Sequence, residues 1–161
     1  MRSVNEEADD NMLQSVPMSE QMRIVDELLA MHTIAVVGIS KDPAKPSHDV
    51  AKYLQSSGYR IIPINPTIQE VLGEKSYPSL LALPDALKRE IEVVDIFRRP
   101  EDVPPIVAEA VKLHESFGHP KAVWMQLGIV NEAAARQAMD AGLQVVMDRC
   151  MKIEHERRKQ S

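Results

Sequence analysis

The sequence has few of the residues that mark several large classes of protein. Cys150 is its single cysteine, so the chain can form no internal disulfide and has none of the CxxC spacings of zinc sites. No apolar run approaches the ~20 residues of a membrane helix, and the start MRSVNEEADD lacks the apolar segment of a signal peptide. These absences predict a cytoplasmic protein with no membrane partner, stabilised by packing alone.

Basic residues are also too few and too scattered for a nucleic-acid surface. The net charge is −5, and the first twenty residues hold one basic and five acidic side chains, so the rest of the chain is nearly neutral. A protein that binds a phosphate backbone usually presents a basic stripe. This sequence has none, so nucleic acid is not the expected partner. The histidines show no HExxH or HxxEH spacing, and no metal site is expected.

The length of 161 residues suits a single domain. Residues 1–17 are acidic, polar and without periodicity, which predicts a disordered tail. Residues 18–156 form the predicted domain, with its core from about residue 30, and residues 157–161 read as a polar C-terminal tail. A helix is expected from Ser19 to Met31, with Ser19 as its N-cap.

Short apolar, β-branched segments alternate with helical patterns along the rest of the chain. The predicted strands are 33–38, 59–64, 93–97, 122–126 and 143–147, and the predicted helices are 47–54, 101–117 and 132–141. A brief extended segment and a loop helix are expected within 71–83, and Pro63 requires an edge strand. The alternation predicts a single-domain, Rossmann-like α/β fold, with a mostly parallel sheet of about five strands and helices on both faces. In such sheets the ligand lies beyond the carboxyl ends of the strands, where the strand order reverses.

The loop after the first predicted strand is the first candidate site. It runs from Gly38 to Ser47 and contains Lys41 and Lys45, so its backbone N–H groups and cations could hold a phosphate. An ordinary solvated loop is an equal alternative on these residues alone. A valine at Gly38 is expected to abolish ligand binding in a protein that still folds, by filling the space that the diphosphate approaches.

A standard dinucleotide-binding fingerprint is absent. Gly38 is the only glycine of the loop, with Ser40 where the second glycine of GxGxxG would stand. The acidic residue that binds the NAD ribose is also missing after the second strand, where Asn65 stands. NAD is therefore disfavoured as the ligand.

Several blocks of sequence, in order, resemble a known family. They are VVGIS at 36–40, KPS at 45–47, GYRIIPINP at 58–66, VDIFR at 94–98, VWMQLG at 123–128 and VMDRC at 146–150. Together they resemble the small stand-alone bacterial CoA-binding proteins, whose domain is similar to the nucleotide-binding domain of the succinyl-CoA synthetase alpha subunit. The resemblance covers about residues 30–155.

This resemblance implies coenzyme A as the ligand, lying across the strand ends. The residues that it assigns to CoA binding are Gly38, Ile39, Ser40, Lys41, Lys45, Ser47, Asn65, Pro66, Arg98, Gln126, Leu127 and Gly128. The Gly38–Ser47 loop would lie near the diphosphate, Asn65 and Pro66 beside the adenosine, and 126–128 along the pantetheine arm. For Arg98 a surface role beside a helix start stays open.

The role of such a protein is open between two classes. No nucleophile and base stand at interpretable positions, which favours a module that binds CoA or an acyl-CoA without catalysis. The synthetases also use a phosphate-accepting histidine and a second domain, for which this chain is too short. The alternatives are an NAD(P)- or acyl-CoA-dependent enzyme and a nucleotide-sensing regulator. A homo-oligomer or protein partner is open as well, and Cys150 is either an inert thiol or one that forms a mixed disulfide with CoA.

Overall fold

The computed structural model describes residues 16–159 of the chain. Most of the predicted acidic tail, residues 1–15, lies outside these residues, as do residues 160–161. No helix among residues 16–159 is long and apolar enough to cross a membrane.

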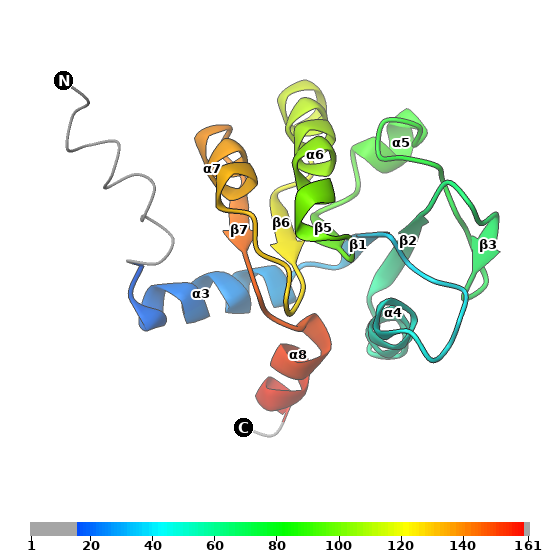
Figure 1. The fold of residues 1–161 in the computed structure, drawn as a ribbon, viewed down its shortest axis with the longest axis horizontal. Coiled ribbons are helices and arrows are strands. Elements are labelled where there is room, and N and C mark those ends of the chain that lie inside the picture. Colours follow the sequence, from blue (N-terminus) through cyan, green and yellow to red (C-terminus); the bar gives the residue numbers. More distant parts are fainter. Residues whose placement is uncertain (1–15, 160–161) are drawn as a thin grey trace.

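The centre of the molecule is a five-stranded sheet in which every pairing is parallel (Figure 1). Its strands are β1 Thr33–Val37, β2 Arg60–Ile64, β5 Val93–Ile96, β6 Ala122–Met125 and β7 Gln144–Val146. They lie in the order β2-β1-β5-β6-β7, so the chain first moves from β1 to β2 and later returns to the other side of β1. The strand order therefore reverses between β1 and β5.

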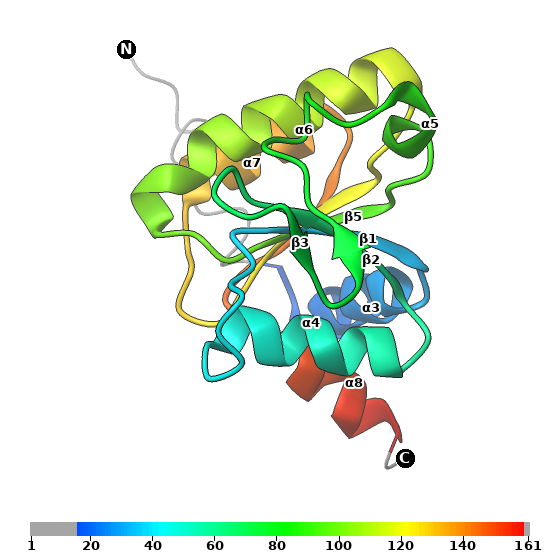
Figure 2. The ribbon, with the colours of Figure 1, turned by 90° about the vertical axis from the view of Figure 1, so that its right-hand side faces the viewer.

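Helices cover both faces of this sheet, as Figure 2 shows edge-on. They are α3 Met18–Leu29, α4 Pro46–Ser56, α5 Asp85–Lys88, α6 Val103–Phe117, α7 Glu132–Asp140 and α8 Met151–Lys159. One buried apolar cluster joins the sheet to α6 and α7, and a second joins the opposite face to α3, α4 and α8. The predicted Rossmann-like α/β fold in one domain is confirmed.

Proline and glycine account for several element boundaries. Pro63 lies in β2, at the edge of the sheet, where the missing N–H costs no bond to a second strand. Pro104 and Pro105 occupy the first turn of α6, which a 3₁₀ turn, Pro100–Asp102, precedes. The side chain of Asn131 accepts a hydrogen bond from the N–H of Ala134, so it caps α7 as predicted.

The region between β2 and β5 holds a short antiparallel hairpin, β3 Glu70–Val71 and β4 Glu74–Lys75. It matches the predicted extended segment, but the helix that follows, α5, begins only at Asp85. Tyr77 continues the edge of the main sheet, because its N–H donates to the carbonyl of Pro63 and its own carbonyl accepts from Asn65. The edge strand β2 is thus partly covered.

The structure differs from the sequence-based expectations at both ends of the domain. Helix α3 begins at Met18 with Pro17 as its N-cap, so Ser19 is inside the helix and caps nothing. The C-terminal helix α8 was not predicted, and it includes residues 157–159, which the sequence placed in a polar tail. Its buried residues are Met151 and Glu154, and it packs against α3 and α4.

Candidate functional site

A cleft of about 580 Å³ opens where the strand order reverses. Seven of the twelve residues assigned from sequence line it: Gly38, Ser40, Lys45, Ser47, Arg98, Gln126 and Leu127. They come from the loops after β1, β5 and β6 and from the first turn of α4, which meet because parallel strands end at one edge of a sheet. We call this space the switch-point cleft.

Three more of the assigned residues, Lys41, Asn65 and Pro66, line a neighbouring cavity of about 770 Å³ beside the β3–β4 hairpin. We call it the Asn65 cavity. A smaller cavity of about 290 Å³ lies between the two, sharing Gly38 and Arg98 with the cleft and Pro66 with the Asn65 cavity. An extended ligand thus has a continuous path across the strand ends.

Two assigned residues contribute less than the sequence suggested. The side chain of Ile39 is fully buried in the apolar cluster, and its carbonyl accepts a 2.8 Å hydrogen bond from Nδ2 of Asn65, so its side chain cannot contact a ligand in the cleft. Gly128 follows Leu127 at the rim, where its N–H donates to Oδ1 of Asp148 at 2.7 Å. Neither residue lines any of these three cavities.

The loop after β1 is held in shape by its own hydrogen bonds. The Ser40 N–H donates to Oγ of Ser47 at 3.0 Å, and the Ser40 hydroxyl accepts from the N–H of Asp42. Nδ1 of the buried His48 lies 2.9 Å from the Ser40 carbonyl oxygen. These contacts order the loop before any ligand arrives, but they also occupy the Ser40 N–H that the sequence offered to a phosphate.

Gly38 is required for a reason that the sequence did not reveal. Its φ is +86°, and a Cβ at this position would lie 2.3 Å from the carbonyl oxygen of Phe97 and 2.9 Å from Cδ of Arg98. The backbone of β1 therefore passes against the end of β5 itself. The expectation of a well-folded valine variant is wrong, because the branched side chain would collide with the protein before it met a diphosphate.

The charge of the switch-point cleft is positive. Its described lining includes Lys45, Arg98 and Arg99 and no carboxylate. Asp102, which lines the smaller connecting cavity, lies 3.7 Å from Arg98 and 3.0 Å from Arg99. The arginine side chains are 46% and 73% exposed, so both stay accessible to an anion in the cleft.

A buried carboxyl lies beneath the cleft. Asp95 of β5 is fully buried, and its Oδ1 accepts a 2.6 Å hydrogen bond from Nε2 of Gln126, while Oδ2 has no partner. Burial raises the pKa of Asp95 to about 7, and the hydrogen bond from Gln126 opposes that rise. Oε1 of Gln126 accepts from the N–H of Met151 at 3.4 Å, so Gln126 joins the central strand to the start of α8.

Besides Pro46 and Arg99, four residues line the cleft that were not among the twelve assigned: Val50, Phe97, Ile129 and Cys150. The first three are apolar residues without a motif, and only tertiary packing brings them to the cleft. Cys150 reaches it because β7 ends there and α8 begins at Met151. Together they give the Gln126 end of the cleft an apolar, thiol-bearing wall.

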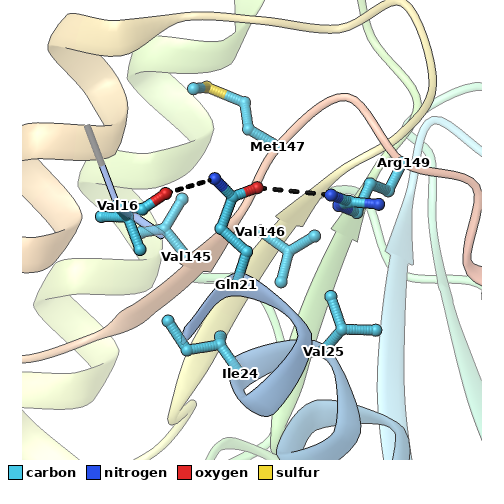
Figure 3. A pocket seen from close by; sticks show the side chains of 8 residues that line it. All are labelled: Val16, Gln21, Ile24, Val25, Val145, Val146, Met147 and Arg149. Atoms are coloured by element: carbon cyan, nitrogen blue, oxygen red, sulfur yellow. Dashed lines mark hydrogen bonds between the residues drawn. The ribbon is translucent and has the colours of Figure 1, made fainter. Parts of the chain in front are cut away.

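A separate cavity of about 110 Å³ lies between α3 and β7 (Figure 3). Nε2 of Gln21 donates to the carbonyl of Val16, and Oε1 of Gln21 accepts from Arg149 at 3.3 Å. Its other walls are mainly valine, isoleucine and methionine side chains, and it includes none of the twelve assigned residues. It is a packing gap at the edge of the sheet rather than part of the candidate site.

Residues 32–156 match a family described as CoA binding domain. The chain belongs to the CoA-binding domain family. The family that the sequence blocks suggested is thereby confirmed, and the matched range contains all twelve assigned residues. Whether those residues contact CoA is taken up below as a proposal.

The chain is similar to proteins from several organisms. An uncharacterised protein of Bacillus subtilis, YneT, is 40% identical over 122 residues, which is 76% of this chain and 84% of YneT. The structure of a hypothetical protein from Pyrococcus horikoshii OT3 has 41% identity and a TM-score of 0.76, over 84% of this chain and 90% of that one. An ADP-forming acetate–CoA ligase of Archaeoglobus fulgidus is 31% identical over 88 residues, which is 53% of this chain but 12% of the ligase.

Proposed function

We propose that the protein binds coenzyme A across the carboxyl ends of its parallel strands and does so without catalysing a reaction on it. The observation that carries this proposal is the path of adjoining cavities from the Asn65 cavity to the switch-point cleft, which is cationic beside Lys45, Arg98 and Arg99 and apolar toward Leu127 and Cys150. Membership of the CoA-binding domain family supports the same ligand.

The three parts of CoA suit the three parts of this path. The diphosphate would lie by Gly38, Ser40 and Ser47, where Lys45 and Arg98 supply positive charge. The adenosine would occupy the Asn65 cavity, where Lys41 and Lys75 are the cations available to its 3′-phosphate. The pantetheine arm would follow Gln126 to Gly128 along the apolar wall.

The same geometry argues against NAD. An acidic side chain at the end of β2 normally binds the ribose hydroxyls, but Asn65 is found there and its Nδ2 already donates to the Ile39 carbonyl. The extra phosphate of CoA, by contrast, adds charge that the nearby lysines can neutralise. CoA should therefore bind more tightly than either NAD or dephospho-CoA.

Thermal unfolding in the presence of each ligand tests the proposal. At 100 times its dissociation constant a ligand adds ~2.7 kcal/mol to the free energy of unfolding, so CoA should raise the Tm by about 5–10 °C. Dephospho-CoA should raise it less and NAD less still. An equal shift with NAD would contradict the CoA assignment, and turnover of CoA or an acyl-CoA by the purified protein would contradict the non-catalytic role.

A lysine variant makes the test specific. Lys41→Gln should reduce the difference between the CoA and dephospho-CoA shifts, because it removes one of the two lysines that line the Asn65 cavity. Lys121→Gln is the matched control, since Lys121 is exposed and directly precedes β6, at the amino ends of the strands. The control should retain the full difference.

A further inference from the structure

A fifth cavity, of about 600 Å³, lies between α8 and the loop and first turn of α4. We call it the α4–α8 groove. Pro46, Val50 and Cys150 line both this groove and the switch-point cleft. The two spaces therefore meet at the thiol of Cys150, and the groove extends the cleft beyond its apolar end.

The proposed function fixes which end of CoA would reach this junction. With the adenosine beside Asn65 and the diphosphate beside Ser40, the pantetheine arm can extend only away from β2, toward Leu127 and Cys150. The CoA sulfur would then lie where the cleft passes into the groove. Any group attached to that sulfur would continue past Cys150.

The walls of the groove favour an uncharged aliphatic group. Pro43, Ala44 and Ile153 supply apolar surface, and Ile153 is 42% exposed, so its side chain is available to a ligand in the groove. The only cation in the lining, Lys152, donates a 2.9 Å bond to Oδ2 of Asp49 and is thereby neutralised. Glu156 adds a further negative charge, which would repel a carboxylate.

We propose that the α4–α8 groove holds the acyl group of an aliphatic acyl-CoA, so that the protein binds such thioesters in preference to free CoA. This inference rests on the proposed function, because it takes the position of the sulfur from it. Each methylene fully removed from water strengthens binding by ~0.8 kcal/mol, or about fourfold. In an open groove, where burial is partial, we expect about twofold per methylene.

Isothermal titration with CoA, acetyl-, butyryl-, hexanoyl- and succinyl-CoA tests it. Affinity should rise along the aliphatic series, with hexanoyl-CoA bound at least tenfold more tightly than CoA, whereas succinyl-CoA should bind no more tightly than CoA. Equal affinity for CoA and hexanoyl-CoA would refute the binding of the acyl group in the groove but would be consistent with the proposed CoA site. Failure of CoA and every thioester to bind would overturn both proposals.

A substitution in the groove locates the acyl group. Ile153→Glu places a carboxylate in the groove at a helical position that accepts glutamate, so it should keep the affinity for CoA and lose the gain for hexanoyl-CoA. Leu81→Glu is the matched control, because Leu81 is 41% exposed and lines none of the five cavities described above. A gain that survives Ile153→Glu, or a parallel loss of CoA affinity in that variant, would overturn the proposal.

Discussion

Gln126 holds the carboxyl of Asp95, 31 residues earlier in the chain, through a 2.6 Å hydrogen bond between the carboxyl ends of β5 and β6. The pair joins the interior of the sheet to the lining of the switch-point cleft, since Asp95 is fully buried and Gln126 borders the cleft. The other carboxyl oxygen of Asp95 has no partner. An ionised Asp95 would thus be a poorly compensated charge in the core.

Asp95 should make the stability of the protein depend on pH. Burial raises the pKa of its carboxyl to about 7, so the folded chain holds this proton more tightly than the unfolded chain. The free energy of unfolding should therefore fall as the pH rises from about 4 to about 7 and then level off, by an amount on the order of a few kcal/mol. Asp95→Asn should remove this dependence.

Urea unfolding of the wild-type protein and Asp95→Asn at several pH values between 4.5 and 7.5 measures the effect. The stability of the variant relative to the wild type should increase with pH through this window. Asp85→Asn, which removes an exposed carboxyl, is the control for loss of a charge. A difference between Asp95→Asn and wild type that stays constant with pH would show that Asp95 does not retain its proton.

Gly38→Ala should destabilise the fold and not only the ligand site. The new Cβ would lie 2.3 Å from the Phe97 carbonyl oxygen, so β1 and β5 would have to move apart in addition to the strain of a positive φ. Such strain alone costs about 1–3 kcal/mol, which lowers the Tm by at least several degrees. Gly58→Ala is the comparison, because Gly58 also has a positive φ but nothing within 4 Å of its Cβ position. Equal losses of Tm in the two variants would refute the contact with Phe97 as the cause.

Cys150 should form a mixed disulfide with CoA under oxidising conditions. Its side chain is partly exposed at the junction of the cleft and the groove, where the CoA sulfur is proposed to lie. With CoA disulfide as the reactant, the thiolate of Cys150 attacks one sulfur and releases one molecule of CoA as its thiolate. Mass spectrometry should find one added CoA that dithiothreitol removes. Cys150→Ser should show no adduct. If the wild-type protein stays unmodified, the CoA sulfur does not lie beside Cys150.

Glu154 should be essential for the docking of α8. Its side chain is 5% exposed, and its carboxylate contacts Arg149, Arg157 and Arg158 at 3.0–3.3 Å. Glu154→Gln would leave these cations without their shared partner, and because the arginines are 20–67% exposed and stay partly solvated, we expect a loss of about 1–3 kcal/mol. Glu115→Gln, at an exposed position of α6, is the control for removal of a surface carboxylate. Urea unfolding measures both, and a Glu154→Gln variant as stable as the wild type would show that the other contacts of α8 are sufficient to hold the helix.

The sequence by itself determined the order and type of most elements. Runs such as TIAVV at 33–37 are apolar on both faces, which suits only a strand buried between helices, and Pro63 can be accommodated only at an edge. Helix α8 escaped prediction because its stability comes from ion pairs, those of Glu154 and that of Arg158 with Asp26, rather than from an apolar stripe. The Arg158–Asp26 pair joins residues 132 positions apart, which no periodicity in the sequence records.

Some features of the candidate site likewise followed from the sequence, and others only from the structure. The sequence located its loops, because parallel strands must end at one edge and the family blocks lie at those ends. Only the tertiary structure showed that the Phe97 carbonyl leaves no room for a side chain at position 38, and that Gln126 donates to the buried Asp95. It also showed that Cys150 lines both the switch-point cleft and the α4–α8 groove. These facts depend on distances between residues remote in sequence, which local propensity and spacing do not contain.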